Sequence, residues 1–130
     1  MHNKLSCNTV PLEPTPHGAL KRVIVRHEDM RSPLMFVNEV YVNPGEDIAK
    51  HSHGDMEEIF YFLDGTGIMQ IEEETYSVAP GDRFIISAKV EHYLKNMGQT
   101  PMRFICFGVK ETQHLQKSSS NTSINGNDGS

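Results

Sequence analysis

Two histidines and a carboxylate lie at a spacing that suits a metal ion. His51 and His53 are two residues apart, so in an extended chain both imidazoles point to the same face and can reach one ion. Glu58 begins the apolar run EIFYFL, where Phe60 and Phe62 share its face. An unpaired carboxylate among aromatic rings is unfavourable, and a cation beside it removes that penalty.

A fourth candidate ligand, His92, follows the turn at residues 80–82 and a further apolar run. Three imidazoles and one carboxylate suit Fe, Mn, Zn, Ni, Co or Cu, with coordination positions left open for water and a substrate. The sequence therefore predicts one divalent transition metal ion, whose identity stays open. The predicted ligands are His51, His53, Glu58 and His92.

Short apolar runs separated by turn residues must position these side chains. They are rich in β-branched and aromatic residues, and their turns recur about every 8–12 residues, which is typical of an all-β sandwich or barrel. No stretch shows sustained helical periodicity. About eight strands predict a double-sheet jelly-roll barrel. We expect strands within residues 21–27, 34–42, 58–63, 68–71, 75–78, 83–87, 91–95 and 102–109.

The ligand spacing resembles the first motif of the cupin superfamily: glycine, five residues, His-x-His, three or four residues, glutamate, six residues, glycine. Its fixed positions are filled by Gly45, His51, His53, Glu58 and Gly65. Glu57 fits the shorter spacing but leaves the last glycine one residue out of register. We therefore expect Glu58 to face inward, and strand alternation then turns Glu57 outward.

The second cupin motif is also recognisable, with two departures. Gly81, His92 and Asn96 stand at their expected positions, whereas Ser87 replaces a proline and Lys89 replaces a glycine in the turn before the histidine. We expect Asn96 to fix a turn through hydrogen bonds to the backbone. The two motifs together cover residues 45–96, and their joint match is far more specific than His-x-His alone.

The resemblance implies a small single-domain cupin with a metal-centred pocket, usually a homodimer. Cupins include dioxygenases, isomerases, lyases, decarboxylases and non-catalytic binding proteins, so the fold does not name a reaction. We expect a divalent-metal-binding cupin that acts on a small oxygen-bearing organic molecule as a metal-dependent dioxygenase, isomerase or lyase. The alternative is a non-catalytic module that binds or senses a small molecule in the same pocket.

An enzyme would need a proton-transferring side chain near the metal, and the sequence assigns none. If the run at residues 34–42 turns Glu39 and Tyr41 inward, they could assist; the opposite orientation, with residues 38, 40 and 42 inside, is equally compatible with the pattern. A cavity lined mainly by apolar groups would instead favour oxygenation or binding. The candidates for proton transfer are Glu39, Tyr41, Lys50, Arg83 and Arg103.

Composition places the chain among ordinary globular proteins of one domain. Its 130 residues carry a formal charge of -5 with no basic stripe, which argues against nucleic acid or membrane partners. Cys7 and Cys106 are expected to be reduced thiols, and with no apolar leader they indicate a cytoplasmic protein. We expect an extended arm at residues 1–18, the cupin domain at 19–117 and a disordered polar tail at 118–130.

Two further expectations concern the surface. The outward strip Ile59, Tyr61 and Leu63 needs cover, which predicts a homodimer unless the arm or the other sheet supplies that cover. The four remaining histidines match no motif and are expected on the surface. They are His2, His17, His27 and His114.

Overall fold

Strands account for most of the residues that the computed structural model describes, which are residues 4–111. In chain order the elements are η1 (Cys7–Thr9), β1 (Glu13–Pro14), β2 (Leu20–Arg26), η2 (His27–Asp29), β3 (Leu34–Val42), β4 (Asp47–His51), β5 (Met56–Asp64), β6 (Gly67–Ile71), β7 (Glu74–Val78), β8 (Arg83–Ile86), β9 (His92–Asn96) and β10 (Met102–Lys110). Within this range the only helices are the two short 3-10 turns, and none could cross a membrane.

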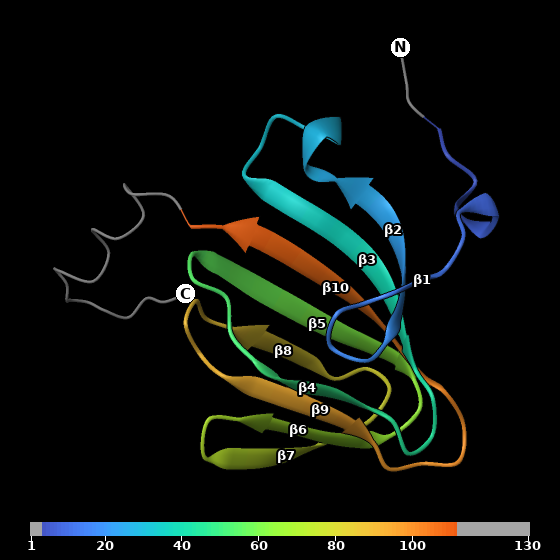
Figure 1. Ribbon diagram of the computed structural model, residues 1–130, viewed down its shortest axis with the longest axis vertical. Coiled ribbons are helices and arrows are strands. Elements are labelled where there is room, and N and C mark those ends of the chain that lie inside the picture. The colour runs from blue at the N-terminus through green and yellow to red at the C-terminus, as the bar shows by residue number, and fades with distance from the viewer. Residues whose placement is uncertain (1–3, 112–130) are drawn as a thin grey trace, which may run out of the picture.

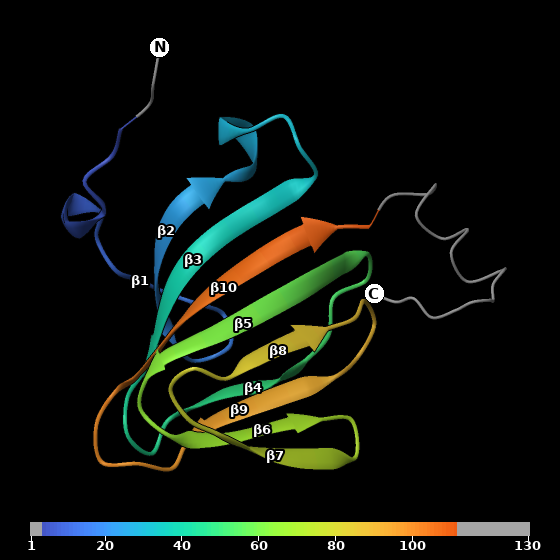
Figure 2. The same ribbon diagram turned by 180° about the vertical axis from the view of Figure 1, so that it is seen from behind.

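The strands form two antiparallel sheets, which confirms the all-β jelly-roll prediction. The large sheet has the order β1-β2-β3-β10-β5-β8, and the small sheet has the order β4-β9-β6-β7 (Figures 1 and 2). The prediction of a barrel was wrong in one respect, because the sheets do not close. Among residues 4–111 the edge strands β4 and β7 pair only within the small sheet, so the fold is a sandwich with open edges.

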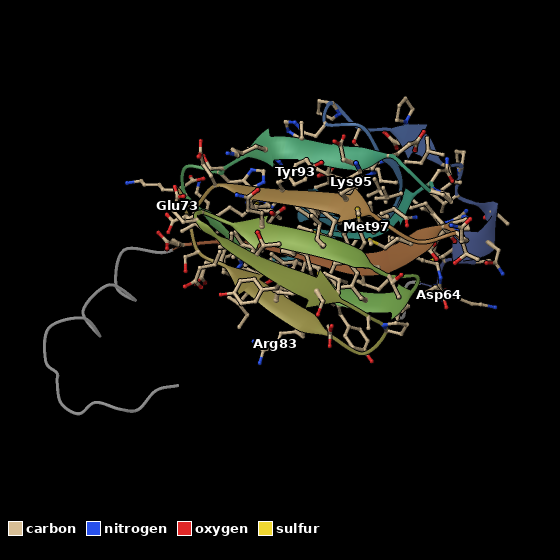
Figure 3. The ribbon with its side chains drawn as sticks, turned by 90° about the horizontal axis from the view of Figure 1, so that it is seen from below. Asp64, Glu73, Arg83, Tyr93, Lys95 and Met97 are labelled. Carbon is tan, nitrogen blue, oxygen red and sulfur yellow. The ribbon has the colours of Figure 1, made fainter. Side chains whose placement is uncertain are left out.

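The core lies between the two sheets and follows the period-two alternation of the strands. Along β9, buried Leu94 and Asn96 alternate with Tyr93 and Lys95, which project from the outer face of the small sheet (Figure 3). The largest fully buried side chains include Phe62, Phe104, Met69 and Leu94. Burial of each such side chain stabilises the fold by about 1.5–3 kcal/mol before entropy is counted.

All eight predicted strands are present, and two more were missed. β4 carries the single core-directed apolar residue Ile48, and its pairing with β9 rather than a hydrophobic pattern makes it a strand. β1 is a two-residue edge strand within the predicted arm. Cys7 and Cys106 are both free thiols. The predicted tail, His2 and His114 lie outside the described residues.

Candidate metal centre

Four predicted ligands from separate parts of the sandwich converge at one place between the sheets. His51 ends β4 and His92 begins β9 in the small sheet, Glu58 lies on β5 in the large sheet, and His53 lies in the loop that joins the sheets. One ligand atom from each residue lies within 4.8 Å of those from the other three. The arrangement could therefore hold one metal ion.

The polar atoms at this point are close together and yet unpaired. Glu58 Oε1 lies 3.2 Å from His53 Nε2 and 3.1 Å from His92 Nε2. All three atoms are buried, and none has a hydrogen bond of acceptable geometry among the described residues. Buried polar atoms are normally satisfied, so three that converge unsatisfied indicate a missing charged partner. The donor set therefore fits a cation.

Two of the imidazoles are held in a defined orientation by backbone carbonyls. His51 Nδ1 lies 2.7 Å from the carbonyl oxygen of Ala49, and His92 Nδ1 lies 3.0 Å from that of Val90. An Nδ1–H that donates to a carbonyl leaves the lone pair on Nε2, which is the form a metal needs. Both contacts use the residue two positions earlier, so each strand orients its own histidine.

The local electrostatics keep the carboxylate charged. Burial raises the pKa of Glu58, but its contact with His92 and the charges of the neighbouring imidazoles lower it more, so its pKa lies below the usual value. Burial also lowers the pKa of His51 and thereby favours its neutral form. Both shifts favour the protonation states that coordinate a metal.

The second carboxylate oxygen of Glu58 is engaged by a thiol. Cys106, buried on β10, donates to Glu58 Oε2 over 3.6 Å. Burial, reinforced by the negative charge of Glu58, raises the pKa of Cys106 well above its ordinary value, so the thiol stays protonated as the donor. This contact leaves Glu58 Oε1 to face the histidines.

The two candidate carboxylates lie on opposite faces of β5. Glu58 is 5% exposed and points inward with Phe60 and Phe62, whereas Glu57 is exposed on the opposite face. The predicted orientation of the strand is confirmed. Whether Glu58 binds a metal stays a prediction.

In the turn before His92, Lys89 stands where the motif has a glycine. Lys89 adopts the left-handed conformation, with φ of 69°, that glycine accepts most readily. Its amide donates to the carbonyl of His53 over 2.6 Å, and Val90 N–H donates to Ser87 over 3.3 Å. The turn therefore connects the loop of His53 to the strand of His92.

A fourth histidine adjoins the cluster, which corrects the expectation that His17 is a simple surface residue. His17 is half-buried, and its ring stacks on that of His51 at a centroid distance of 4.0 Å and an interplanar angle of 11°. The Ala49 amide donates to the His17 carbonyl over 2.9 Å. No local spacing relates the arm to β4, so the sequence offered no signal for this contact. His27 is exposed, as expected.

A cavity of about 400 Å³ opens beside the cluster, and the inward face of β3 forms part of its wall. Asn38, Val40 and Val42 are buried, which settles the orientation that the sequence left open. None of the five residues considered for proton transfer lines this cavity. Its polar and charged lining comprises Thr15, His17, Lys21, Arg26, His27, Glu28, Asn38, His51, His53, Glu58 and Cys106.

Three of those five candidates belong to a network on the outer face of the large sheet. Glu39 contacts Arg22 at 2.9 Å and Arg103 at 3.1 Å, and Tyr41 donates to Glu39 over 3.0 Å. Arg22 also donates to the carbonyl of Val10 and so holds the arm against the sheet. These residues stabilise the surface and do not reach the cluster.

A jelly roll of two antiparallel sheets with a His/Glu cluster between them defines the class of small cupin proteins. The cupin domain family model matches residues 38–108, and the chain belongs to that family. The match includes all four predicted ligands.

Proteins similar to this chain differ in what their names describe. An uncharacterized protein of Methanocaldococcus jannaschii is 28% identical over 77% of this chain and 80% of its own. A predicted oxalate decarboxylase from Thermotoga maritima superposes with a TM-score of 0.78 at 18% identity, over 84% of this chain and 100% of its own. A 5-nitrosalicylic acid 1,2-dioxygenase of Bradyrhizobium sp. is 31% identical over 39% of this chain, which spans 24% of that protein's length.

Proposed function

We propose that the protein binds one divalent transition metal ion on His51, His53, Glu58 and His92. The observation that supports this proposal most directly is the convergence of three buried, unpaired ligand atoms. Mixed imidazole and carboxylate donors suit first-row transition metals, and the backbone contacts to His51 and His92 leave Nε2 available.

We further propose that the metal serves a small oxygen-bearing organic molecule that enters the adjoining cavity. The ion would supply a Lewis acid, and O₂ chemistry if it is iron. The chain would orient the molecule against apolar walls and exclude water around it. None of the five candidates from the sequence lines the cavity, but Lys21, His27 and Glu28 do, so the lining offers acid–base groups for an isomerase or lyase reaction as well. The 5-nitrosalicylic acid 1,2-dioxygenase among the relatives is compatible with oxygenation.

The same absence of the five proton-transfer candidates from the cavity supports a second function. A non-catalytic cupin that binds or senses a small molecule would need the metal and the apolar walls, but no general acid or base. Turnover of O₂ by iron-loaded protein in the presence of a bound molecule separates the enzyme from the binding module.

Elemental analysis of protein purified without chelators or a metal-binding tag tests the metal proposal. We expect near-stoichiometric divalent metal in the wild type and loss of most of it in His51→Ala and His53→Ala. His27→Ala is the matched control, because its exposed imidazole lies outside the cluster. Wild-type protein that holds no metal and takes up none on addition would refute the proposal.

A further inference from the structure

A buried amide faces the cavity with its oxygen unpaired. Asn38 is 8% exposed, and its Oδ1 has no hydrogen-bond partner among residues 4–111. The strand register places it between Val23 of β2 and Cys106 of β10. Val23 has no polar group, and the Cys106 thiol donates to Glu58 instead. A buried polar atom left unpaired in this way destabilises a fold unless a ligand or a water molecule forms a hydrogen bond with it.

Aromatic and aliphatic side chains form much of the wall around this amide, and the charged side chains of Lys21, Arg26 and Glu28 also line the cavity. Gly108, opposite Glu58 in the register, allows Phe36 to approach, since a Cβ there would lie 2.4 Å from the Phe36 ring. Aromatic walls favour flat partners that offer a ring face or edge. The aromatic and large aliphatic lining comprises Val23, Met35, Phe36, Val40, Ile48, Phe60 and Phe104.

Two polar anchors thus lie beside the apolar part of the wall. The histidine cluster is one anchor, and the Asn38 amide, which can accept and donate, is the other. A volume of about 400 Å³ is ordinary for a small organic ligand. Few precisely placed polar groups in an apolar cavity are what give such sites their specificity.

We propose that Asn38 is a ligand-recognition residue that hydrogen-bonds a hydroxyl or N–H group of a planar aromatic molecule. The ring of that molecule lies among the phenylalanines, and an oxygen at its other end faces the histidine cluster. This inference rests on the proposed function in one respect, since the ligand occupies the cavity beside the proposed metal.

Naphthol binding to protein as purified tests this role. The chain has no tryptophan, so probe fluorescence can be followed without interference from indole. The probes are 2-naphthol and naphthalene diols whose hydroxyls lie on opposite rings. We expect at least one diol to bind wild-type protein about tenfold more tightly than 2-naphthol, because its second hydroxyl can donate a hydrogen bond to the unpaired Oδ1 of Asn38. Asn38→Leu should abolish that advantage, and Asn43→Leu, which changes an exposed asparagine, should keep it.

A stability measurement on ligand-free protein gives an independent readout. Asn38→Leu replaces an unpaired amide by an apolar group of similar size, so we expect a higher melting temperature, whereas loss of a structural asparagine would lower it. The proposal is overturned if no diol binds more tightly than 2-naphthol, if the advantage survives in Asn38→Leu, or if that variant melts lower. Metal analysis of the same samples keeps the two proposals apart: a diol preference that depends on Asn38 in protein without metal supports recognition and refutes only the metal site.

Discussion

At the scale of single residues, the site depends on which polar atoms form hydrogen bonds and which have no partner. The carbonyls of Ala49 and Val90 orient two imidazoles, and a thiol occupies one oxygen of Glu58. What remains free is the set of atoms that faces the centre of the cluster. Each of these atoms is useful for coordination only in its deprotonated form.

The first prediction separates two adjacent carboxylates. Glu58→Gln removes the negative charge from the cluster and should lower metal affinity at least 10–100-fold. Glu57→Gln is the matched control and should be nearly silent, because its side chain lies on the exposed face of β5. Metal affinity measured for both variants in one buffer decides the question. A larger loss in Glu57→Gln would overturn the assignment of Glu58.

The second prediction concerns acid. The folded-state pKa values of His51 and Glu58 both lie below their ordinary values of 6.5 and 4.5. The unfolded chain therefore binds more protons, and stability should fall as the pH drops below about 6.5, with a further loss below about 4.5. Metal binding should weaken in the same direction, since imidazoles must be neutral to coordinate. Denaturation and metal titrations across this range measure both effects, and a metal affinity that rises on acidification would contradict them.

At the scale of elements, short loops and turns bring the ligands together. The β4–β5 loop passes from the small sheet to the large one, and its His53 carbonyl accepts from the turn before β9. Where the arm joins the domain, hydrogen bonds between Thr15 and Ala19 close a turn. This turn positions the His17 ring so that it stacks on His51. The cluster is thus defined by contacts between elements rather than by any one strand.

The third prediction tests the left-handed residue in that turn. Lys89→Gly removes the Cβ strain of a positive φ, and the greater freedom of glycine in the unfolded chain offsets part of the gain. We expect the free energy of unfolding to rise by about 0.5 kcal/mol. Lys89→Ala, which removes the same exposed side chain but keeps the Cβ, should show no gain. Chemical denaturation compares the three proteins, and a loss of stability in Lys89→Gly would show that the turn is not strained.

At the scale of the whole molecule, the part of the outer face of the large sheet that β5 and β8 form is left uncovered within residues 4–111. Tyr61 is 44% exposed and Ile85 is 52% exposed, and Ile85 pairs with Ile59 across β5 and β8. The small sheet covers the other face. Strand β1 of the arm lies at the far edge of the same sheet, beyond β2. In the part of the chain that the structure describes, neither of the alternative covers considered from the sequence therefore reaches this strip.

The fourth prediction is that a second copy of the chain covers that strip. Light scattering at micromolar concentration should give the mass of a dimer, and Tyr61→Glu or Ile85→Glu should shift it to that of a monomer, because a charge is strongly disfavoured in an apolar interface. Met97→Glu is the control: Met97 is also exposed, but it lies beyond the end of β9 in the small sheet (Figure 3). A monomer mass for the wild type would reject the prediction.

The sequence by itself determined the all-β class, most strands and the four residues that converge. Alternation and turn residues are local, so they could be read directly, and the cupin spacing tied His92 to the first three ligands across the chain. The sequence also predicted that Asn96 hydrogen-bonds the backbone. Its amide donates to the carbonyls of Val42 and Thr100, over 2.8 Å and 2.9 Å.

Only the tertiary structure decided the rest. Either orientation of β3 satisfied the sequence pattern, and packing between the sheets selected the one that buries Asn38 and turns Glu39 to the surface. His17 reaches His51 because the arm folds back over β4, a contact between segments that share no local pattern. Whether the sheets close into a barrel depends on pairing at edge strands, and β4, which is one of them, carries almost no hydrophobic signal. Such non-local contacts are fixed by how surfaces fit, which a period of two along one strand does not encode.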